Sequence, residues 1–144
     1  MLVVLIIYKM TSISTLLHDN FQFLHPEVQA DLNLKNFTED HSLIITKNHV
    51  FSKYNETIRP NYIILFNTSK EKLILYDGGF GMGYYCNIAF DINTKIYSYA
   101  TYSDETVIRH ILFSSTDWLE VKKYVYGDLE NFLDHCEKMS SKVI

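Results

Sequence analysis

Six histidines and two cysteines are the side chains of this sequence best suited to bind a metal ion or attack a substrate. No two histidines stand two or four residues apart, and neither H-E-x-x-H nor C-x-x-C occurs. Those spacings matter because they bring two ligands to one side of a helix or turn. We therefore expect no metal site and no cofactor.

Neither cysteine is placed to act as a nucleophile. A reactive thiol needs an exposed, electropositive setting with a histidine nearby, whereas Cys86 falls on the apolar side of an alternating segment. Cys136 continues the helical spacing of the apolar residues before it, which predicts a buried thiol. The serine hydrolase signature G-x-S-x-G is absent. The sequence favours a protein without catalytic activity.

Four of the five glycines lie in the segment Asp77-Gly-Gly-Phe-Gly-Met-Gly83. A dinucleotide-binding loop opens a helix, and a phosphate-binding P-loop ends in Gly-Lys-Ser or Gly-Lys-Thr. Here the following residues alternate as in a strand, so the segment is predicted to be a mobile loop between strands. Its alternative role is contact with a partner or ligand, with Gly79, Phe80 and Gly81 as candidate residues.

Eleven tyrosines are a second unusual feature. Tyrosine is enriched at recognition surfaces because it joins a large rigid ring to one polar group. Most of these tyrosines are expected to be half-buried in strands. Tyr85 and Tyr102 fall on the side opposite the predicted core, which makes them candidate partner-binding residues.

A predicted helix at 117–139 carries most of the negative charge. It holds six carboxylates and three lysines, a net charge of −3, where the whole chain has −4. A solvated helix face explains this charge without any function. The alternative is an acidic docking surface for a basic protein, because complementary charge speeds association. Its candidate residues are Asp128, Glu130 and Asp134.

The composition is that of a globular protein. The chain has 144 residues, of which 47% are hydrophobic and 21% are charged. This length predicts a single domain, 1–144, with a core that needs neither a metal nor disulfides. The mild acidity argues against nucleic-acid binding, which needs a basic surface.

The longest apolar run, at 2–8, is too short to span a bilayer, which takes about 20 residues. It also lacks the flanking charge and the small-residue cleavage site of a signal peptide. The run is either a buried first strand or an extension upstream of a start at Met10. Because this run can neither span a membrane nor act as a signal peptide, we expect a protein without membrane association. Two cysteines form no disulfide framework, which favours a cytoplasmic location.

The first half of the chain predicts two short helices followed by strands. The helical spacing of Leu16, Leu17 and Phe21 ends at His25-Pro26, where a second helix begins and runs to about residue 34. Further along, β-branched and aromatic residues become frequent, as in strands. The strands expected there are 42–46, 61–66 and 72–76.

The strongest pattern is a hairpin. Residues 84–92 alternate strictly, and a turn at Asn93-Thr94 would pair Phe90 with Tyr97 and Ile88 with Tyr99 on the core face. The residues expected to face away from the core are Asn87, Asp91 and Ser98.

The last third of the chain predicts one more strand and the long helix. Residues 107–113 fit either a strand or a helix, and their β-branched content favours a strand. The helix begins with Asp117-x-x-Glu120, a variant of the capping box, and Gly127 weakens it by about 1 kcal/mol relative to alanine. Its inward residues are Trp118, Val121, Val125, Leu129 and Phe132. The whole pattern predicts an α+β fold, with a curved antiparallel sheet of five or six strands, N-terminal helices and a long C-terminal helix packed on it.

In size, acidity, tyrosine content and lack of an active-site signature, the chain resembles the small immunity proteins with which bacteria neutralise polymorphic or contact-dependent toxins. The Asp117-Trp-Leu-Glu120 opening of the final helix adds to this resemblance. It implies stoichiometric inhibition of a cognate toxin, often a basic nuclease.

Two other classes remain open. A small-ligand-binding domain would enclose an apolar cavity between the sheet and the final helix, beside Tyr97 and Tyr99. An enzyme with a dispersed active site would show converging polar groups in a cleft.

Overall fold

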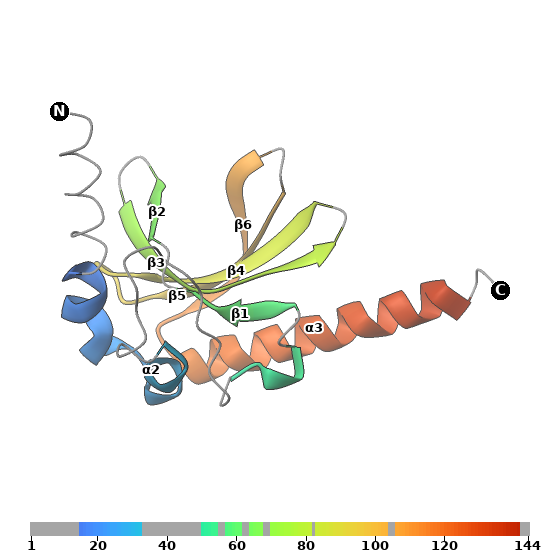
Figure 1. Ribbon diagram of the computed structural model, residues 1–144, viewed down its shortest axis with the longest axis horizontal. Coiled ribbons are helices and arrows are strands. Elements are labelled where there is room, and N and C mark those ends of the chain that lie inside the picture. Colours follow the sequence, from blue (N-terminus) through green and yellow to red (C-terminus); the bar gives the residue numbers. More distant parts are fainter. Residues whose placement is uncertain are drawn as a thin grey trace.

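The computed structural model describes residues 15–32, 50–54, 57–61, 64–67, 70–81, 83–103 and 106–141. Residues 15–20 are helical, and short helices, strands and one long helix follow (Figure 1). The named elements are η1 (Phe21–Phe23), α2 (Pro26–Leu32), η3 (Ser52–Tyr54), β1 (Ile58–Pro60), β2 (Ile64–Asn67), β3 (Lys70–Gly81), β4 (Tyr84–Asp91), β5 (Tyr97–Ser103), β6 (Thr106–Ser115) and α3 (Trp118–Ser141). The strand expected at 42–46 and the apolar run at 2–8 lie outside the described residues.

The described strands form one antiparallel sheet. Its order is β1-β3-β4-β5-β6, and β2 pairs with the first residues of β3. Figure 1 shows α2 and α3 below the sheet, while β2 and β6 curl toward the opposite side. The predicted α+β fold, a curved antiparallel sheet of five or six strands with N-terminal helices and a long C-terminal helix packed on it, is confirmed.

β4 and β5 pair in the predicted register. Phe90 lies opposite Tyr97 and Ile88 lies opposite Tyr99, and all four side chains are buried. Strict alternation allowed this prediction, because a shift by one residue would move every apolar side chain to the other face.

The loop between β4 and β5 is longer than the predicted two-residue turn. Asp91 Oδ1 accepts hydrogen bonds from the backbone N–H groups of Asn93 at 2.9 Å and Thr94 at 3.0 Å. Lys95 adopts the left-handed conformation, with φ of 63°. The loop closes without changing the register of the strands.

The central residues of the sheet face opposite α3 are also buried. Asn87 and Ser98 point away from α3, as predicted, but expose only 2% and 5% of their surface. Arg109 of β6 reaches over both residues, because its Nε donates to Asn87 Oδ1 at 2.7 Å and its Nη1 donates to Ser98 Oγ at 3.1 Å. Burial lowers the pKa of Arg109 to about 10. This side chain therefore ties β6 to the two central strands.

The glycine segment continues a strand, and the predicted mobile loop is wrong. β3 extends to Gly81 and pairs with β4 over this length. A Cβ at Gly78 would lie 1.6 Å from the carbonyl oxygen of Thr57, which also accepts a hydrogen bond from the Gly79 N–H at 2.9 Å. Gly78 is thus needed for the close approach of a neighbouring segment.

The strand prediction for 107–113 is confirmed, since these residues lie within β6. The predicted helix at Pro26 is also present as α2, with Val28 and Leu32 buried. Its proposed end near residue 34 lies outside the described residues. β6 leads directly into α3, and α2 contacts the start of α3 through Glu27.

The main core lies between the sheet and the first half of α3. Trp118 stacks on Tyr76 of β3 with ring centroids 5.8 Å apart, and its Nε1 donates to Glu27 of α2 at 3.2 Å. The predicted inward residues of α3 that are buried are Trp118, Val121, Val125 and Leu129. The first half of α3 is therefore fixed against both the sheet and α2.

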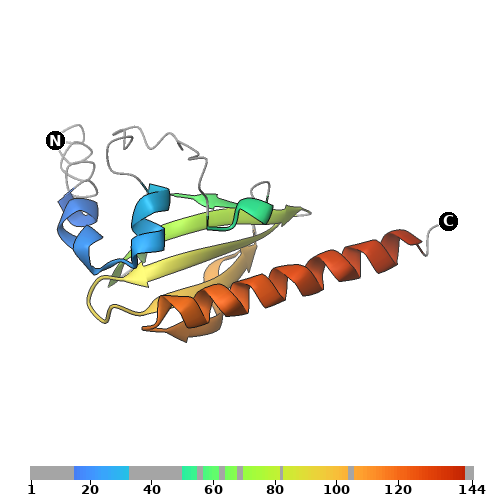
Figure 2. The same cartoon turned by 90° about the horizontal axis from the view of Figure 1, so that it is seen from below.

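The second half of α3 projects beyond the sheet (Figure 2). Residues 133–140 are exposed and Phe132 is only partly buried. Cys136 is exposed as well, so the predicted buried thiol is wrong. Helical spacing identifies the apolar side of a helix, but it does not say how far the neighbouring sheet extends. We call residues 132–141 the overhang.

Candidate functional site

A network of hydrogen bonds fixes the start of α3. Asp117 Oδ1 accepts a hydrogen bond from the Leu119 N–H at 3.0 Å, as an N-cap residue does. Ser115 Oγ accepts from the Asp117 N–H at 3.0 Å and donates to Glu120 Oε2 at 2.9 Å. Ser115 thus bridges the two residues that a capping box would join directly.

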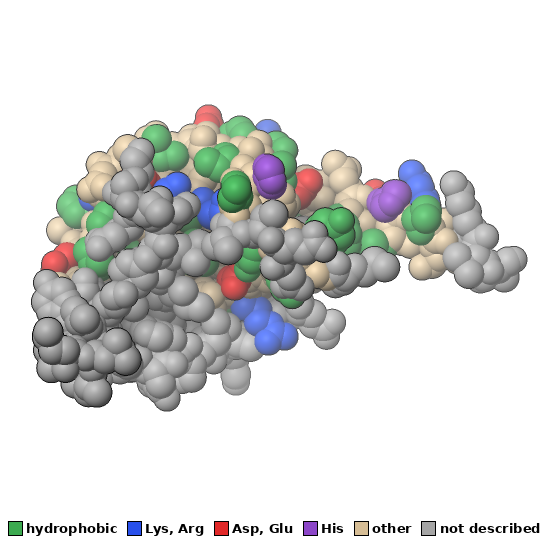
Figure 3. All heavy atoms as spheres, turned by 90° about the horizontal axis from the view of Figure 1, so that it is seen from above, with side chains coloured by type: hydrophobic (Ala, Val, Ile, Leu, Met, Phe, Trp, Pro, Cys, Tyr) green, Lys and Arg blue, Asp and Glu red, His purple; other side chains and the backbone are tan. Residues whose placement is uncertain are grey.

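Apolar side chains continue along the overhang after the sheet has ended. Leu133 and Met139 expose 42% and 52% of their surface, and Cys136 is also exposed. Residues three and four apart share one side of a helix, so Phe132 and Cys136 extend the stripe that ends in the core at Leu129. In Figure 3, hydrophobic and charged side chains lie next to one another on this projecting end.

Three carboxylates of α3 were predicted as partner contacts, and they differ in their surroundings. Asp134 is exposed on the overhang. Glu130 is paired with Lys53 and accepts a hydrogen bond from the hydroxyl of Tyr54. The hydrogen bond from Lys53 lowers the pKa of Glu130. Glu130 therefore holds η3 against α3.

Asp128 lies on another side of α3 from Glu130. Its Oδ2 accepts a hydrogen bond from the hydroxyl of Tyr99 at 2.7 Å. Burial raises the pKa of Tyr99 well above its usual value, and the neighbouring Asp128 adds to this effect. Tyr99 consequently remains a proton donor to Asp128 throughout the physiological range.

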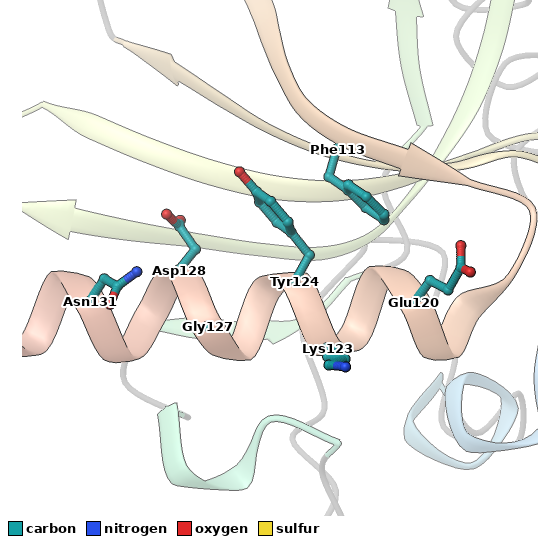
Figure 4. Close-up of a pocket in the computed structure, with 7 residues that line it drawn as sticks. All are labelled: Phe113, Glu120, Lys123, Tyr124, Gly127, Asp128 and Asn131. Atoms are coloured by element: carbon teal, nitrogen blue, oxygen red, sulfur yellow. The ribbon is translucent and has the colours of Figure 1, made fainter.

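An open pocket lies along α3 beside Asp128, with a volume of about 670 Å³ (Figure 4). Phe113 of β6 and Tyr124 of α3 stack there with ring centroids 4.8 Å apart. The lining residues are Phe113, Glu120, Lys123, Tyr124, Gly127, Asp128 and Asn131. Figure 4 shows Glu120 and Asp128 on the same side of α3 as the two rings, while Lys123 points away. The pocket thus combines an aromatic wall with carboxylates.

Tyr85 and Tyr102, the other predicted partner residues, form a separate group. Their rings stack with centroids 5.3 Å apart, and the hydroxyl of Tyr102 donates to Asp77 Oδ1 at 2.8 Å. Gly79 lies opposite Tyr85 in the sheet. Since this group lies on the sheet face that points away from α3, the structure does not bring it together with the acidic residues of α3.

The remaining loop-contact candidates, Phe80 and Gly81, belong to the end of β3. Gly81 lies opposite Tyr84 in the register of β3 and β4. Tyr84 exposes 63% of its surface. The glycine candidates therefore lie beside tyrosines, at the end of the sheet.

The described residues contain no group of three His, Cys, Asp or Glu side chains that could hold a metal ion. Cys86 is buried, and burial raises the pKa of its thiol to about 12. At neutral pH this thiol remains protonated, which makes it a poor nucleophile.

The sequence led to a pocket between the sheet and the final helix only as part of the small-ligand alternative, and of the lining residues only Asp128 was a candidate site residue. The others were missed because the wall of the pocket belongs to two elements. Phe113 and Tyr124 are 11 positions apart, and no local pattern indicates that β6 and α3 meet there. The one available signal was Gly127, which is unfavourable in the middle of a helix. α3 nevertheless runs through this residue without interruption.

Comparison of the chain with protein-family models, with curated proteins and with solved structures finds no match. Among the described helices, none is both long enough and apolar enough to cross a membrane.

Proposed function

We propose that this chain is a non-catalytic protein-binding module and that it binds a basic protein through the overhang of α3. One observation carries the proposal: the apolar stripe of α3 continues beyond the sheet, where Leu133, Cys136 and Met139 are exposed. Apolar surface in water is unfavourable by about 25 cal/mol per Å² relative to buried surface. A partner that covers the overhang would recover this free energy.

The charge of this part of α3 favours a basic partner. From residue 128 to the end of α3 there are four carboxylates and one lysine, Lys138. Glu130 is offset by Lys53, while Asp134 and Glu137 are exposed. Exposed charges that complement those of a partner accelerate encounter, and salt weakens this effect.

At a finer level, we propose that the chain is a bacterial, cytoplasmic immunity protein that neutralises a cognate basic toxin by stoichiometric binding. The acidity, the tyrosine content and the absence of any catalytic signature in the sequence support this proposal. A large toxin gene directly upstream of the gene for this chain would favour it further.

The small-ligand alternative has one observation in its favour, the open pocket between β6 and α3. Its lining includes neither Tyr97 nor Tyr99, although Tyr99 contacts two of the lining residues, with its hydroxyl on Asp128 and its ring centroid 6.2 Å from that of Tyr124. Tyr97 contacts Trp118 with ring centroids 5.3 Å apart. Because the pocket is open and has two carboxylates, Glu120 and Asp128, in its lining, it suits a charged group of a protein partner better than an enclosed apolar ligand.

The test is co-expression of the full chain with the product of the neighbouring gene, followed by purification of the complex. We expect a stable complex that is weakened by Leu133→Ser and Met139→Ser, because these changes remove apolar surface from the overhang. Ile108→Ser is the matched control, since Ile108 is 66% exposed on β6. Absence of a complex, or a complex weakened by the Ile108 variant alone, would contradict the proposed surface.

A further inference from the structure

Gly127 occupies a position that packing within the described chain does not explain. A Cβ at this position would meet nothing within 4 Å, so alanine or a larger residue fits there without a clash. Glycine is the least favourable residue in the middle of a helix, apart from proline. Neither helix stability nor steric conflict accounts for glycine here.

Gly127 contributes to the lining of the open pocket. It lies on α3 between Tyr124 and Asn131 (Figure 4), and it is exposed, so the absence of a side chain leaves the helix backbone accessible there. A group that enters the pocket can therefore approach α3 more closely here than at any position with a Cβ.

The pocket carries a net negative charge. Glu120 and Asp128 each use one carboxylate oxygen in a hydrogen bond, to Ser115 and Tyr99 respectively. Their second oxygens, Oε1 and Oδ1, have no hydrogen-bond partner in the described part of the chain. Lys123 is the one lysine of the lining, and it points away from the rings and carboxylates (Figure 4).

We propose that this pocket receives an arginine side chain of the basic partner. The guanidinium would lie against the exposed backbone at Gly127, between the two carboxylates and the aromatic wall. This inference rests on the proposed function and adds the chemical group that is recognised. A guanidinium is planar, donates up to five hydrogen bonds and stacks on aromatic rings. It therefore suits a site with free carboxylate oxygens next to Tyr124. A lysine ammonium is compact and strongly hydrated, so it gains less from an aromatic wall.

The pocket is tested without the partner, by NMR titration of the full chain with Nα-acetyl-arginine N′-methylamide. The corresponding lysine and citrulline derivatives are the matched probes, because they change the shape or the charge of the end group. We expect shifts of the amide signals of Tyr124, Gly127 and Asp128, with affinity for the arginine derivative at least threefold above that for lysine. We expect no saturable shift with citrulline.

Two variants distinguish an effect on binding in the pocket from an effect on the stability of α3. Gly127→Ala and Gly127→Leu place side chains in the open space, and both should raise the melting temperature by about 2–8 °C. They should also weaken binding of the arginine derivative, by about tenfold for leucine. Ser140→Ala favours the helix outside the pocket, so it should leave this binding unchanged.

Equal shifts with all three derivatives, or shifts at residues away from the pocket, would overturn the arginine site. So would undiminished binding to Gly127→Leu. In these cases a complex that depends on Leu133 would still support the protein-binding function. If the arginine derivative binds but no complex with a protein partner forms, the proposed protein-binding function is contradicted, and the pocket is a site for small cationic ligands.

Discussion

Asp31 of α2 lies completely buried with its carboxylate against the core. Its Oδ2 accepts hydrogen bonds from the Val50 N–H and the Tyr76 hydroxyl, both at 2.7 Å. Oδ1 has no partner in the described part of the chain. Burial raises the pKa of Asp31, although the two hydrogen bonds act in the opposite direction. The folded state therefore binds this proton more tightly than the unfolded state.

This raised pKa predicts the sign of a pH effect. Because the folded state holds the proton more tightly, Asp31 should reduce stability as the pH rises from about 4 through its raised pKa. Asp31→Asn removes this titration, so the variant should become progressively more stable relative to wild type over the same range. Urea unfolding at several pH values measures the difference. A difference that is constant with pH would contradict the assignment.

Phe90 gives the most direct test of the hairpin. Its side chain is fully buried and packs against Tyr97 with ring centroids 5.0 Å apart. Phe90→Ala should lower the free energy of unfolding by about 3–5 kcal/mol, because it removes buried surface and leaves a cavity. Denaturant unfolding measures this loss, with the exposed Phe23 changed to alanine as control. An unchanged unfolding midpoint for the Phe90 variant would contradict the packing.

At the scale of elements, the spacing of apolar residues along the sequence predicted correctly the features that depend only on neighbouring residues. Alternation gave the register of Phe90 with Tyr97, and apolar spacing gave the side of α3 that enters the core. Two predictions failed where the answer depends on distant residues. Gly78 accommodates Thr57, which lies 21 positions earlier, and Cys136 is exposed because the sheet does not extend beneath it. Most of the residues that line the pocket were missed for the same reason.

The overhang is an element whose removal should leave the fold intact. Residues 133–140 are exposed, and exposed helix ends contribute little to global stability. Deleting residues 133–144 should therefore lower the free energy of unfolding by less than about 1 kcal/mol. Thermal and urea unfolding of the shortened chain measure this change, with circular dichroism as the check on folding. A loss of several kcal/mol would mean that the overhang contributes to the folded core, which would contradict its role as a free binding surface.

At the scale of the whole molecule, the carboxylates of α3 are not equivalent, and this determines how the charge is tested. Asp128 bonds Tyr99, and Glu130 bonds both Lys53 and Tyr54. Reversal of either charge would disturb internal contacts as well as the surface field. Asp134 and Glu137 are exposed on the overhang, so their reversal to lysine should change stability by no more than about 0.5 kcal/mol each.

The most direct measurement is the association rate of the full chain with its purified partner, at low and at high salt. If a basic protein docks on the overhang, association should slow as salt increases, because salt screens the attraction. The double variant Asp134→Lys/Glu137→Lys should associate about tenfold more slowly at low salt and depend less on salt. Asp19→Lys, an exposed reversal at the other end of the chain, should have a much smaller effect. An association rate that ignores both salt and the double variant would contradict electrostatic docking on α3.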